Sequence, residues 1–518
     1  MNSKLNRRNF LALISSSIAA WFIAPALAQT PESGNRRQNP EGGWKKGDVD
    51  YELPPALSAF ALMSLVLGRA SDRSIIVSAM ARAPLEGVLE YGAASGSERR
   101  KTGLTSFPAG QPVELTLANL LPNTEYVYWL QVRKPGETAF SVRPECRFHT
   151  QRAVGSSFTF GVQGDSHPER PQMNDPELYA RTLLTAANGK PDFYICMGDD
   201  FSVDTLRTVT ADTVAGRYAL QRPFLGLVAQ SASLVLVNGN HEQASLFNYQ
   251  QSDIRHDVAV WAQNARNRHF PTPAPDGFYT GNREPLASIG PLKDYYAWTW
   301  GDALFVVLDN YWHSPAQVDS GFFGDESHGG GRRGSDGHRN RDWWGMTLGD
   351  AQYQWFKQTL EQSKARYKFV FAHHVMGTGR GGIENCDLYE WGGRNHRGDW
   401  EFDKQRPKWG LPVHQLMAKH NVTIFFQGHD HLFARQERDG IVYQEVPNPA
   451  DQGYVAYNQE RYPSGMTLPN SGHLRVTVSP EQVTVDYVRS YLPRDESARQ
   501  VNGEIAHSYT IKPKVSHV

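Results

Sequence analysis

The stretch "SFTFGVQGDSHPER", residues 157–170, is an apolar run that ends abruptly in Asp165, Ser166 and His167. The apolar part predicts a β-strand. Asp165 and His167 are strong metal ligands, and they stand where this strand runs out. In open α/β sheets, ligands gather beyond the carboxyl ends of the strands. The segment therefore predicts both a strand and one part of a binding site.

Strands and helices alternate along the rest of this region. Further strands are predicted at 192–200, 233–242, 302–310, 367–374 and 422–431, and helices at 175–189, before 233, at 348–365 and at 412–420. Apolar spacing of helical period alternates with short apolar runs, which is typical of βαβ units and a largely parallel sheet. The fold class predicted for this region is therefore α/β.

Metal-ligating residue types recur at the ends of five of the predicted strands. They are Asp165, His167, Asp199, Asn240, His241, His373, His429 and His431. A single histidine after a strand is more often a loop residue than a ligand, but five strand ends with the same pattern favour one shared site. Imidazole, carboxylate and amide groups suit Zn, Mn or Fe, and the lack of thiolates argues against a soft-metal site.

These residues fall in short motifs: "GDSH" at 164–167, "GDD" at 198–200, "GNHE" at 239–242, "AHH" at 372–374 and "GHDH" at 428–431. Their order and spacing resemble the calcineurin-like metallophosphoesterase motifs over about residues 157 to 490. The resemblance implies a catalytic domain at 157–518, a sheet sandwich flanked by helices. It also implies two divalent or trivalent metal ions, Fe, Mn or Zn. One ion would be held by Asp165, His167 and His431, the other by Asn240, His373 and His429, with Asp199 bridging both.

The resemblance also implies a reaction. Two metal ions that share a carboxylate and a hydroxide lower the pKa of water enough to supply a nucleophile near neutral pH. The hydroxide would attack a small-molecule phosphate ester, with Asp199 and His241 as catalytic residues; His241 would stabilise the transition state or protonate the leaving oxygen. A phosphomonoesterase is favoured. A phosphodiesterase with the same site, a hydrolase of other esters or amides, and a surface-binding protein with a vestigial metal domain are the alternatives.

Two departures from related patterns bear on the site. Purple acid phosphatases place a tyrosine three residues after the bridging aspartate, where this chain has Ser202, so a purple tyrosinate-iron site is not expected. The fourth motif reads His373-His374-Val375 instead of histidine, any residue, proline. His374 is thus an alternative metal ligand, or a contact to the substrate phosphate.

Two long insertions between the motifs are candidates for substrate recognition. Segment 377–402 follows the fourth motif, and its Arg380, Arg394 and His396 are predicted phosphate contacts, while its aromatic residues stack on a leaving group or pack the loop. Segment 324–342 is rich in glycine and mixed charges. A solvated loop is the favoured interpretation of 324–342, and a lid that uses Arg332 or Arg333 is the alternative.

The region before the motifs has a different pattern. Short alternating strands are predicted within 73–81, 87–92, 113–134 and 146–150. The stretch "LPNTEY", residues 121–126, resembles the fibronectin type III pattern in which a tyrosine closes a corner. We therefore predict an all-β fibronectin III-like sandwich over 56–150, which by itself indicates no chemistry.

The first 28 residues resemble a twin-arginine signal peptide. The run "NRRNFL" at 6–11 precedes an apolar segment at 11–23 and the small residues Ala26 and Ala28. We expect export by the twin-arginine machinery with cleavage after Ala28, a periplasmic or secreted protein without a mature membrane anchor, and a linker over 29–55.

Composition adds few constraints. The 518 residues include 53 Lys+Arg and 54 Asp+Glu, so no basic field for nucleic acid is expected. Of three cysteines, Cys196 lies in an apolar run and is predicted to be a buried thiol. Pairing of Cys146 with Cys386 stays open.

Overall fold

The computed structural model describes residues 54, 57, 62–318, 343–375 and 380–514. The predicted signal peptide, nearly all of the predicted linker and the segment 324–342 lie outside the described residues. All described residues belong to one compact unit, Lys45–Val518. Among the helices in the described ranges, none is both long and apolar enough to cross a bilayer.

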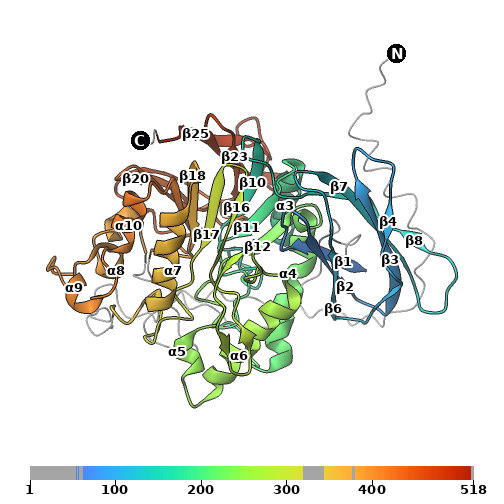
Figure 1. Ribbon diagram of the computed structural model, residues 1–518, viewed down its shortest axis with the longest axis horizontal. Helices are drawn as coiled ribbons and strands as arrows, with labels where there is room; N and C mark the ends of the chain where they lie inside the picture. Colours follow the sequence, from blue (N-terminus) through green and yellow to red (C-terminus); the bar gives the residue numbers. More distant parts are fainter. Residues whose placement is uncertain (1–53, 55–56, 58–61, 319–342, 376–379, 515–518) are drawn as a thin grey trace. The chain divides into compact units, whose positions relative to one another are not determined.

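Two large mixed sheets form the centre of this unit (Figure 1). The nine-stranded sheet has the order β25 (Ile505–Ile511), β24 (Val483–Arg489), β23 (Gly472–Val478), β10 (Phe158–Gln163), β11 (Phe193–Cys196), β12 (Ser233–Leu236), β1 (Met63–Gly68), β2 (Ile75–Ala81), β6 (Pro112–Leu117). The eight-stranded sheet has the order β13 (Thr280–Gly281), β16 (Tyr296–Trp300), β17 (Ala303–Val307), β18 (Tyr367–Phe371), β19 (Ile424–Gln427), β21 (Ile441–Glu445), β20 (Phe433–Arg438), β22 (Met466–Leu468).

Parallel pairing is confined to the middle of each sheet. β10, β11, β12 and β1 pair in parallel in one sheet, and β17, β18, β19 and β21 in the other. The flanking strands are antiparallel. The predicted largely parallel sheet is therefore two sheets, each with a short parallel centre. Of the flanking pairs, β1–β2, β23–β24, β16–β17 and β20–β21 are hairpins with short connections.

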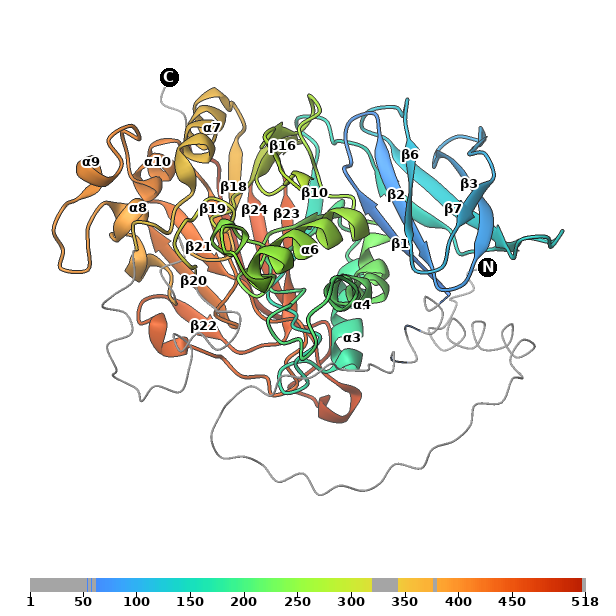
Figure 2. The same ribbon diagram turned by 90° about the horizontal axis from the view of Figure 1, so that it is seen from below.

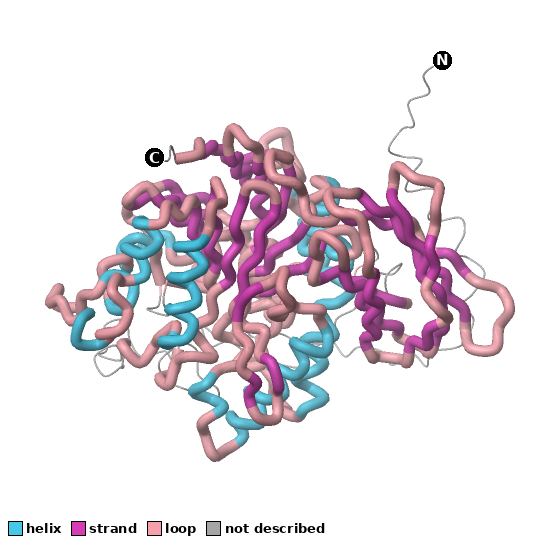
Figure 3. The backbone as a smooth tube through the Cα atoms, in the orientation of Figure 1, coloured by secondary structure: helices cyan, strands magenta, loops and turns pink. Residues whose placement is uncertain are grey.

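The sheets pack face to face through an aromatic core, and helices cover their outer faces. Phe160 and Phe193 of one sheet contact Phe305 of the other, with ring centroids 4.8 to 5.2 Å apart. Helices α3 (Pro176–Asn188), α4 (Ala211–Ala229) and α6 (Ile254–His269) share a core with the nine-stranded sheet, and α7 (Gly349–Gln362), α8 (Tyr389–Gly392) and α10 (Val413–Lys419) with the eight-stranded sheet. Figures 2 and 3 show these helices outside the strands. The predicted α/β sandwich flanked by helices is confirmed.

Shorter elements complete the region that follows residue 157. They are α5 (Leu246–Tyr249), α9 (Phe402–Gln405), the two-stranded sheet β14 (Pro285–Leu286) and β15 (Gly290–Pro291), and 3-10 turns at Ile383–Asn385, Gln459–Arg461 and Pro493–Asp495. Local sequence signals explain where the longer helices begin. Asp175 caps α3 by accepting from the backbone N–H groups of Glu177 and Leu178, and Thr210 forms a capping box with Thr213 at α4.

The N-terminal strands form an all-β part whose two sheets pack on each other. A six-stranded sheet contains β3 (Leu85–Ala93), β4 (Arg100–Lys101), β5 (Thr105–Phe107), β7 (Glu125–Arg133), β8 (Ser141–Val142) and β9 (Cys146–His149). At the predicted corner, the Leu121 N–H donates to the Tyr126 hydroxyl over 2.7 Å. Strands β1, β2 and β6 face this sheet, but they also extend the nine-stranded sheet, since Leu67 of β1 lies in register with Ser233 of β12. A relation of this part to fibronectin III stays a prediction.

All three cysteines are buried and free. Cys196 lies at the end of β11 with its side chain in the apolar core, as predicted for a buried thiol. Cys146 and Cys386 do not pair with each other in the structure.

Candidate metal centre

The metal-ligating side chains follow parallel strands from both sheets. Asp165 and His167 follow β10, Asp199 follows β11, Asn240 and His241 follow β12, His373 follows β18, and His429 and His431 follow β19. The carboxyl ends of these strands meet at one edge of the sandwich, so residues far apart in sequence converge there. Except for partly buried His241, each of these residues is at most 8% exposed.

The converging atoms are close enough to share metal ions. In one group, His373 Nε2 lies 2.9 Å from Asn240 Oδ1 and 3.2 Å from Asp199 Oδ2, and His429 Nδ1 lies 3.0 Å from Asn240 Oδ1. In a neighbouring group, His431 Nε2 lies 3.0 Å from Asp165 Oδ2. The ligand atoms of Asp165, His167 and His431 lie within 4.8 Å of one another, as do those of Asp165, Asp199, His373 and His429.

The side chains of Asp165, His167, Asp199, Asn240, His373, His429 and His431 together form a ring of ligand groups, the metal ring. Hydrogen bonds from residues outside the metal ring orient its imidazole groups. His373 Nδ1 lies 2.8 Å from the Met197 carbonyl oxygen and donates to it, which leaves Nε2 as the nitrogen that faces Asn240 and Asp199. His167 Nδ1 lies 2.9 Å from the Ser202 hydroxyl. Its Nε2 is fully buried, has no hydrogen-bond partner and lies 3.9 Å from Asp199 Oδ2. A buried nitrogen in this position is what a metal ligand requires, so the residues fit metal binding.

The charges of the ring also favour a bound cation. Burial opposes ionisation of Asp199, but nearby His373 and His241 outweigh burial and hold the pKa of Asp199 well below its ordinary value. Burial alone would keep His373 neutral, yet the carboxylates of Asp199 and Asp165 raise its pKa to about 10. The raised pKa means that His373 binds an additional proton next to these carboxylates. A metal ion bound there would replace the positive charge of that proton.

Four of the ligand residues have a strained backbone conformation. His167, Asp199, His429 and His431 all have positive φ angles, between 40° and 78°, which non-glycine residues adopt at a cost. Gly239 permits a close approach, because a Cβ at this position would lie 2.3 Å from both the amide nitrogen and Oδ1 of Asp199. The ligand residues thus adopt costly conformations in which their side chains converge.

His241 lies beside the ring within a hydrogen-bonded group. Its Nε2 is 3.7 Å from Asp199 Oδ2, and its Nδ1 is 2.7 Å from Asp204 Oδ2. The Arg170 Nη2 atom lies 2.8 Å from the same Nδ1. His241 is 14% exposed in its side chain, so it lies at the border between the ring and solvent. Its role facing the substrate stays a prediction.

The predicted phosphate contacts lie in different surroundings. His374 is buried beside the ring, with Nε2 3.1 Å from the Tyr311 hydroxyl. Arg380 donates to the His429 carbonyl oxygen over 2.6 Å and to Asp430 Oδ1 over 2.9 Å. Arg394 is exposed and donates to the Gly398 carbonyl oxygen within its own loop, and His396 is exposed. The structure therefore brings His374 and Arg380 to the ring, and the contacts described for Arg394 are local.

The aromatic residues of the same insertion mostly pack the loop. Trp391 is fully buried and donates through Nε1 to the Tyr443 hydroxyl over 2.9 Å. Tyr389 stacks on Trp343. Of the two interpretations of these aromatics, packing holds for Trp391 and Tyr389, whereas Trp400 is 45% exposed.

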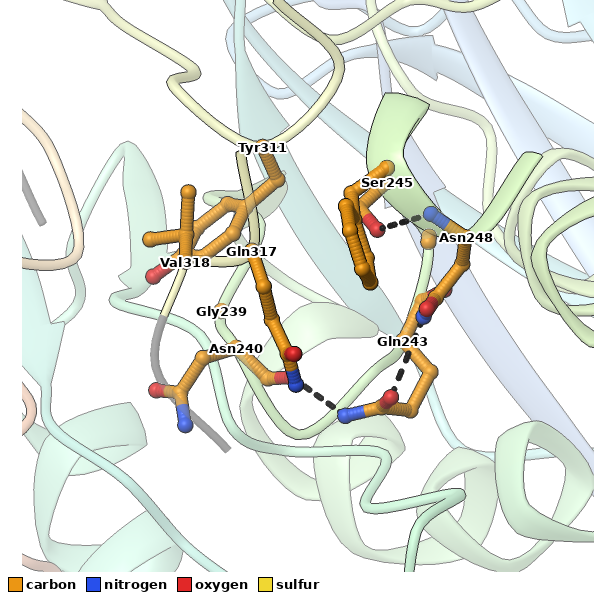
Figure 4. A pocket seen from close by; sticks show the side chains of 10 residues that line it. Gly239, Asn240, Gln243, Ser245, Asn248, Tyr311, Gln317 and Val318 are labelled. Carbon is orange, nitrogen blue, oxygen red and sulfur yellow. Dashed lines mark hydrogen bonds between the residues drawn. The ribbon is translucent and has the colours of Figure 1, made fainter. Parts of the chain in front are cut away.

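A cavity adjoins the ring at Asn240 (Figure 4). Its volume is about 10 Å³, which is small, and it is partly open to solvent. Gln317 extends between Tyr311 and Val318 on one side and Asn248 on the other, and Gln243 donates to the Asn240 carbonyl oxygen over 2.9 Å. None of the described residues that line the cavity is charged. The wall next to Asn240 is therefore neutral and polar.

Another acidic group joins Asp294, which precedes β16, to Asp309 and His313, which follow β17. Asp294, Asp309 and His313 have ligand atoms within 4.8 Å of one another. His313 Nε2 lies 2.8 Å from Asp294 Oδ2, and an ion pair accounts for this contact. Asp309 accepts from the Trp312 backbone N–H through Oδ1, and its Oδ2 is buried without a hydrogen-bond partner.

Comparison with known proteins gives the class. The chain belongs to the calcineurin-like phosphoesterase family, whose model matches residues 158–433, and it is therefore a hydrolase that acts on phosphoric esters. A solved structure of PhoD is similar to the chain with a TM-score of 0.60 and 15% identity, covering 90% of this chain and 92% of that one. A purple acid phosphatase, PPD1, from yellow lupin seeds is similar with a TM-score of 0.53 and 16% identity, covering 86% of this chain and 74% of that one. At 15% and 16% sequence identity, the similarity of the chain to these two structures concerns the fold alone. No curated protein sequence matches the chain.

Sequence reasoning missed two charged residues of the site. Arg170 follows His167 by three residues in the same loop, and Asp204 follows Asp199 by five. Both lie beyond the short motifs, in loops without a regular period. Their proximity to the ligand-bearing strand ends was the one signal in the sequence that pointed to them.

Proposed function

We propose that this protein is an exported phosphoesterase with a dinuclear metal centre and a preference for phosphate monoesters. The observation that carries the proposal is the buried ring of carboxylate, imidazole and amide groups, in which the Nε2 of His167 is buried without a hydrogen-bond partner. This donor set suits borderline or hard metal ions such as Fe, Mn or Zn. The segments proposed to carry export and the sandwich are 1–28 and 56–150, with the catalytic domain at 157–518.

The ligand assignment proposed for the two ions follows the two groups of the ring. Asp165, His167 and His431 would hold one ion, Asn240, His373 and His429 the other, and Asp199 would serve both. When bound, the ions would supply Lewis acidity toward the phosphoryl group and lower the pKa of a water. The Nδ1 contacts of His373 and His167 support these roles, because they leave Nε2 of each ring available to a metal.

His241 is the proposed acid for the leaving oxygen. Its Nδ1 is held by Asp204, and its Nε2 faces the ring beside Asp199. An imidazole fixed by a carboxylate at one nitrogen presents the other to the reacting group in a defined orientation. Loss of His241 should therefore reduce turnover more than metal content.

The test combines metal analysis with three substrates. Metal content by elemental mass spectrometry and hydrolysis of p-nitrophenyl phosphate, bis-p-nitrophenyl phosphate and p-nitrophenyl acetate are measured for wild type and Asp199→Ala. Asp486→Ala is the matched control, because Asp486 is also buried but pairs with Arg475 on the neighbouring strand. Near two metals per chain with phosphate-ester turnover, both lost in Asp199→Ala alone, would support the proposal. A protein that binds no metal and hydrolyses no phosphate ester after Mn, Zn or Fe is added would overturn it.

Export has a separate test. Replacing Arg7 and Arg8 together by lysine should retain the protein in the cytoplasm if the twin-arginine pathway exports it. Cell fractionation with an antibody to the mature chain measures the outcome. Unchanged export of the double variant would contradict this part of the proposal.

A further inference from the structure

Arg170 places a buried positive charge at the edge of the metal ring. The residue is 7% exposed, and its Nη2 lies 2.8 Å from Nδ1 and 3.5 Å from Nε2 of His241. The Nε2 atom of His241 in turn lies 3.7 Å from Asp199 Oδ2. The guanidinium group therefore lies beside the groups proposed to act on the phosphoryl centre.

Two carboxylates hold this guanidinium in place. Arg170 Nε donates to Glu169 Oε1 over 3.1 Å, and Nη2 lies 3.6 Å from Asp204 Oδ2. The Glu169 side chain is 1% exposed, and that of Asp204 is 13% exposed. An arginine fixed by neighbouring carboxylates loses little conformational freedom when it binds a further anion, which favours oxyanion recognition.

The contact between Arg170 and His241 is not a simple hydrogen bond. A ring nitrogen either donates or accepts, and Asp204, an acceptor only, lies 2.7 Å from the same Nδ1. If Nδ1 donates to Asp204, it has no lone pair for Arg170, which can only donate. Asp204 is thus the group that orients the imidazole of His241. Arg170 lies beside the same imidazole as a cationic group and does not orient it.

We infer that Arg170 binds a phosphoryl oxygen and selects phosphate monoesters over diesters; this inference rests on the proposed function. A monoester has three non-bridging oxygens, all of which accept hydrogen bonds and share two negative charges. A diester has two, and its second alkyl group occupies the place of the third. The charge-assisted pairing of arginine with phosphate therefore favours the monoester. The Arg170 side chain is 8% exposed and its Nη2 lies 3.5 Å from His241 Nε2, so its charge is presented from a buried position beside the groups proposed to act on the phosphoryl centre.

The test compares two variants of Arg170 with a matched arginine. Arg170→Met removes the charge, and Arg170→Lys keeps it but loses the forked geometry. The control is Arg217→Met, because Arg217 is 6% exposed and near Glu169, and one of its contacts is the Thr205 hydroxyl at 3.3 Å. For each protein, kcat/KM is measured with p-nitrophenyl phosphate and bis-p-nitrophenyl phosphate, metal content by elemental mass spectrometry, and the affinity for inorganic phosphate by calorimetry.

Arg170→Met should lower kcat/KM for the monoester and the affinity for inorganic phosphate about 10- to 100-fold, as expected for loss of one charge-assisted hydrogen bond. Its kcat/KM for the diester should fall less than about threefold, so the ratio of the two esters changes. Arg170→Lys should show a smaller change of the same ratio, and Arg217→Met none. Metal content should stay at the wild-type level in all variants.

Equal losses for both esters with unchanged phosphate affinity would overturn the inference, since a residue that only supports His241 affects both esters alike. Wild-type protein that hydrolyses neither ester would instead contradict the proposed function. In that case the phosphate titration alone decides the role of Arg170: equal phosphate affinity in wild type and Arg170→Met overturns it, and a weaker affinity in the variant supports it.

Discussion

Replacing Asp204 by asparagine should slow turnover without removing metal. Asp204 Oδ2 lies 2.7 Å from His241 Nδ1. Burial opposes the charge of Asp204, but His241 and Arg170 outweigh burial and lower its pKa, so the group is a carboxylate near neutral pH. A carboxylate in this position fixes the imidazole ring and stabilises its charged form.

The expected loss of turnover follows from the hydrogen bond between Asp204 and His241 that the substitution removes. A hydrogen bond to a charged group contributes about 1.5 to 3 kcal/mol, and about 1.4 kcal/mol corresponds to a tenfold change in rate. Asp204→Asn should therefore lower kcat for p-nitrophenyl phosphate by about 10- to 150-fold. His241→Ala should lower kcat by about 10²- to 10⁴-fold, the usual contribution of an acid or base.

A double-mutant cycle tests whether Asp204 acts through His241. If Asp204 acts through His241, the double variant Asp204→Asn/His241→Ala should be no slower than His241→Ala alone. The assay is kcat on p-nitrophenyl phosphate, with metal content measured on the same samples. Losses that add in the double variant, or metal loss in Asp204→Asn, would refute a role of Asp204 through His241.

Three further predictions concern metal binding, stability and pH. Gly239→Ala should weaken metal affinity roughly 10- to 100-fold, because the new Cβ would lie 2.3 Å from Asp199 Oδ1 and displace it; full metal content by elemental mass spectrometry would contradict this. Asp192→Ala should lower the free energy of unfolding in urea by about 3 to 5 kcal/mol, because it breaks a two-bond ion pair with Arg152 at 2.8 Å; a loss below 1 kcal/mol would contradict it. Burial lowers the pKa of His473 to about 3. Between pH 6.5 and 4 the unfolded chain therefore binds a proton that the folded chain does not. The free energy of unfolding falls by about 3 kcal/mol as the pH falls through this range. His473→Gln should lose correspondingly less than wild type in urea titrations at pH 7 and 4, and equal losses would exclude this cause.

The catalytic elements could be predicted because local patterns suffice for them. The strand that ends at Gln163 and the helix that begins at Pro176 follow from an apolar run, a capping aspartate and a proline at the first helical turn. The metal ring could be predicted for a related reason. Its members sit directly after strands, and parallel strands bring their carboxyl ends together whatever the order of strands in the sheet.

The arrangement of sheets could not be predicted in the same way. The strand at residues 63–68 is not among the predicted strands, and no local pattern indicates that Leu67 pairs with Ser233. That partner depends on packing over a long sequence separation, which leaves no local signal. The roles of Arg170 and Asp204 were missed for a similar reason. Loop residues have no period, and their contacts with His241 depend on how two loops meet.

The nine-stranded sheet has a consequence for how the polypeptide folds. Strand β10 pairs on one side with β23, where Phe158 lies in register with Val478, and the sheet continues on the other side through β11 and β12 to β1. Strands from both ends of the sequence therefore complete one hydrogen-bonded surface. Contacts over such separations close large loops and form late. Until β23 has been synthesised, the edge of β10 that it will cover stays open, and we expect this sheet to close only after residues 472–478 have left the ribosome.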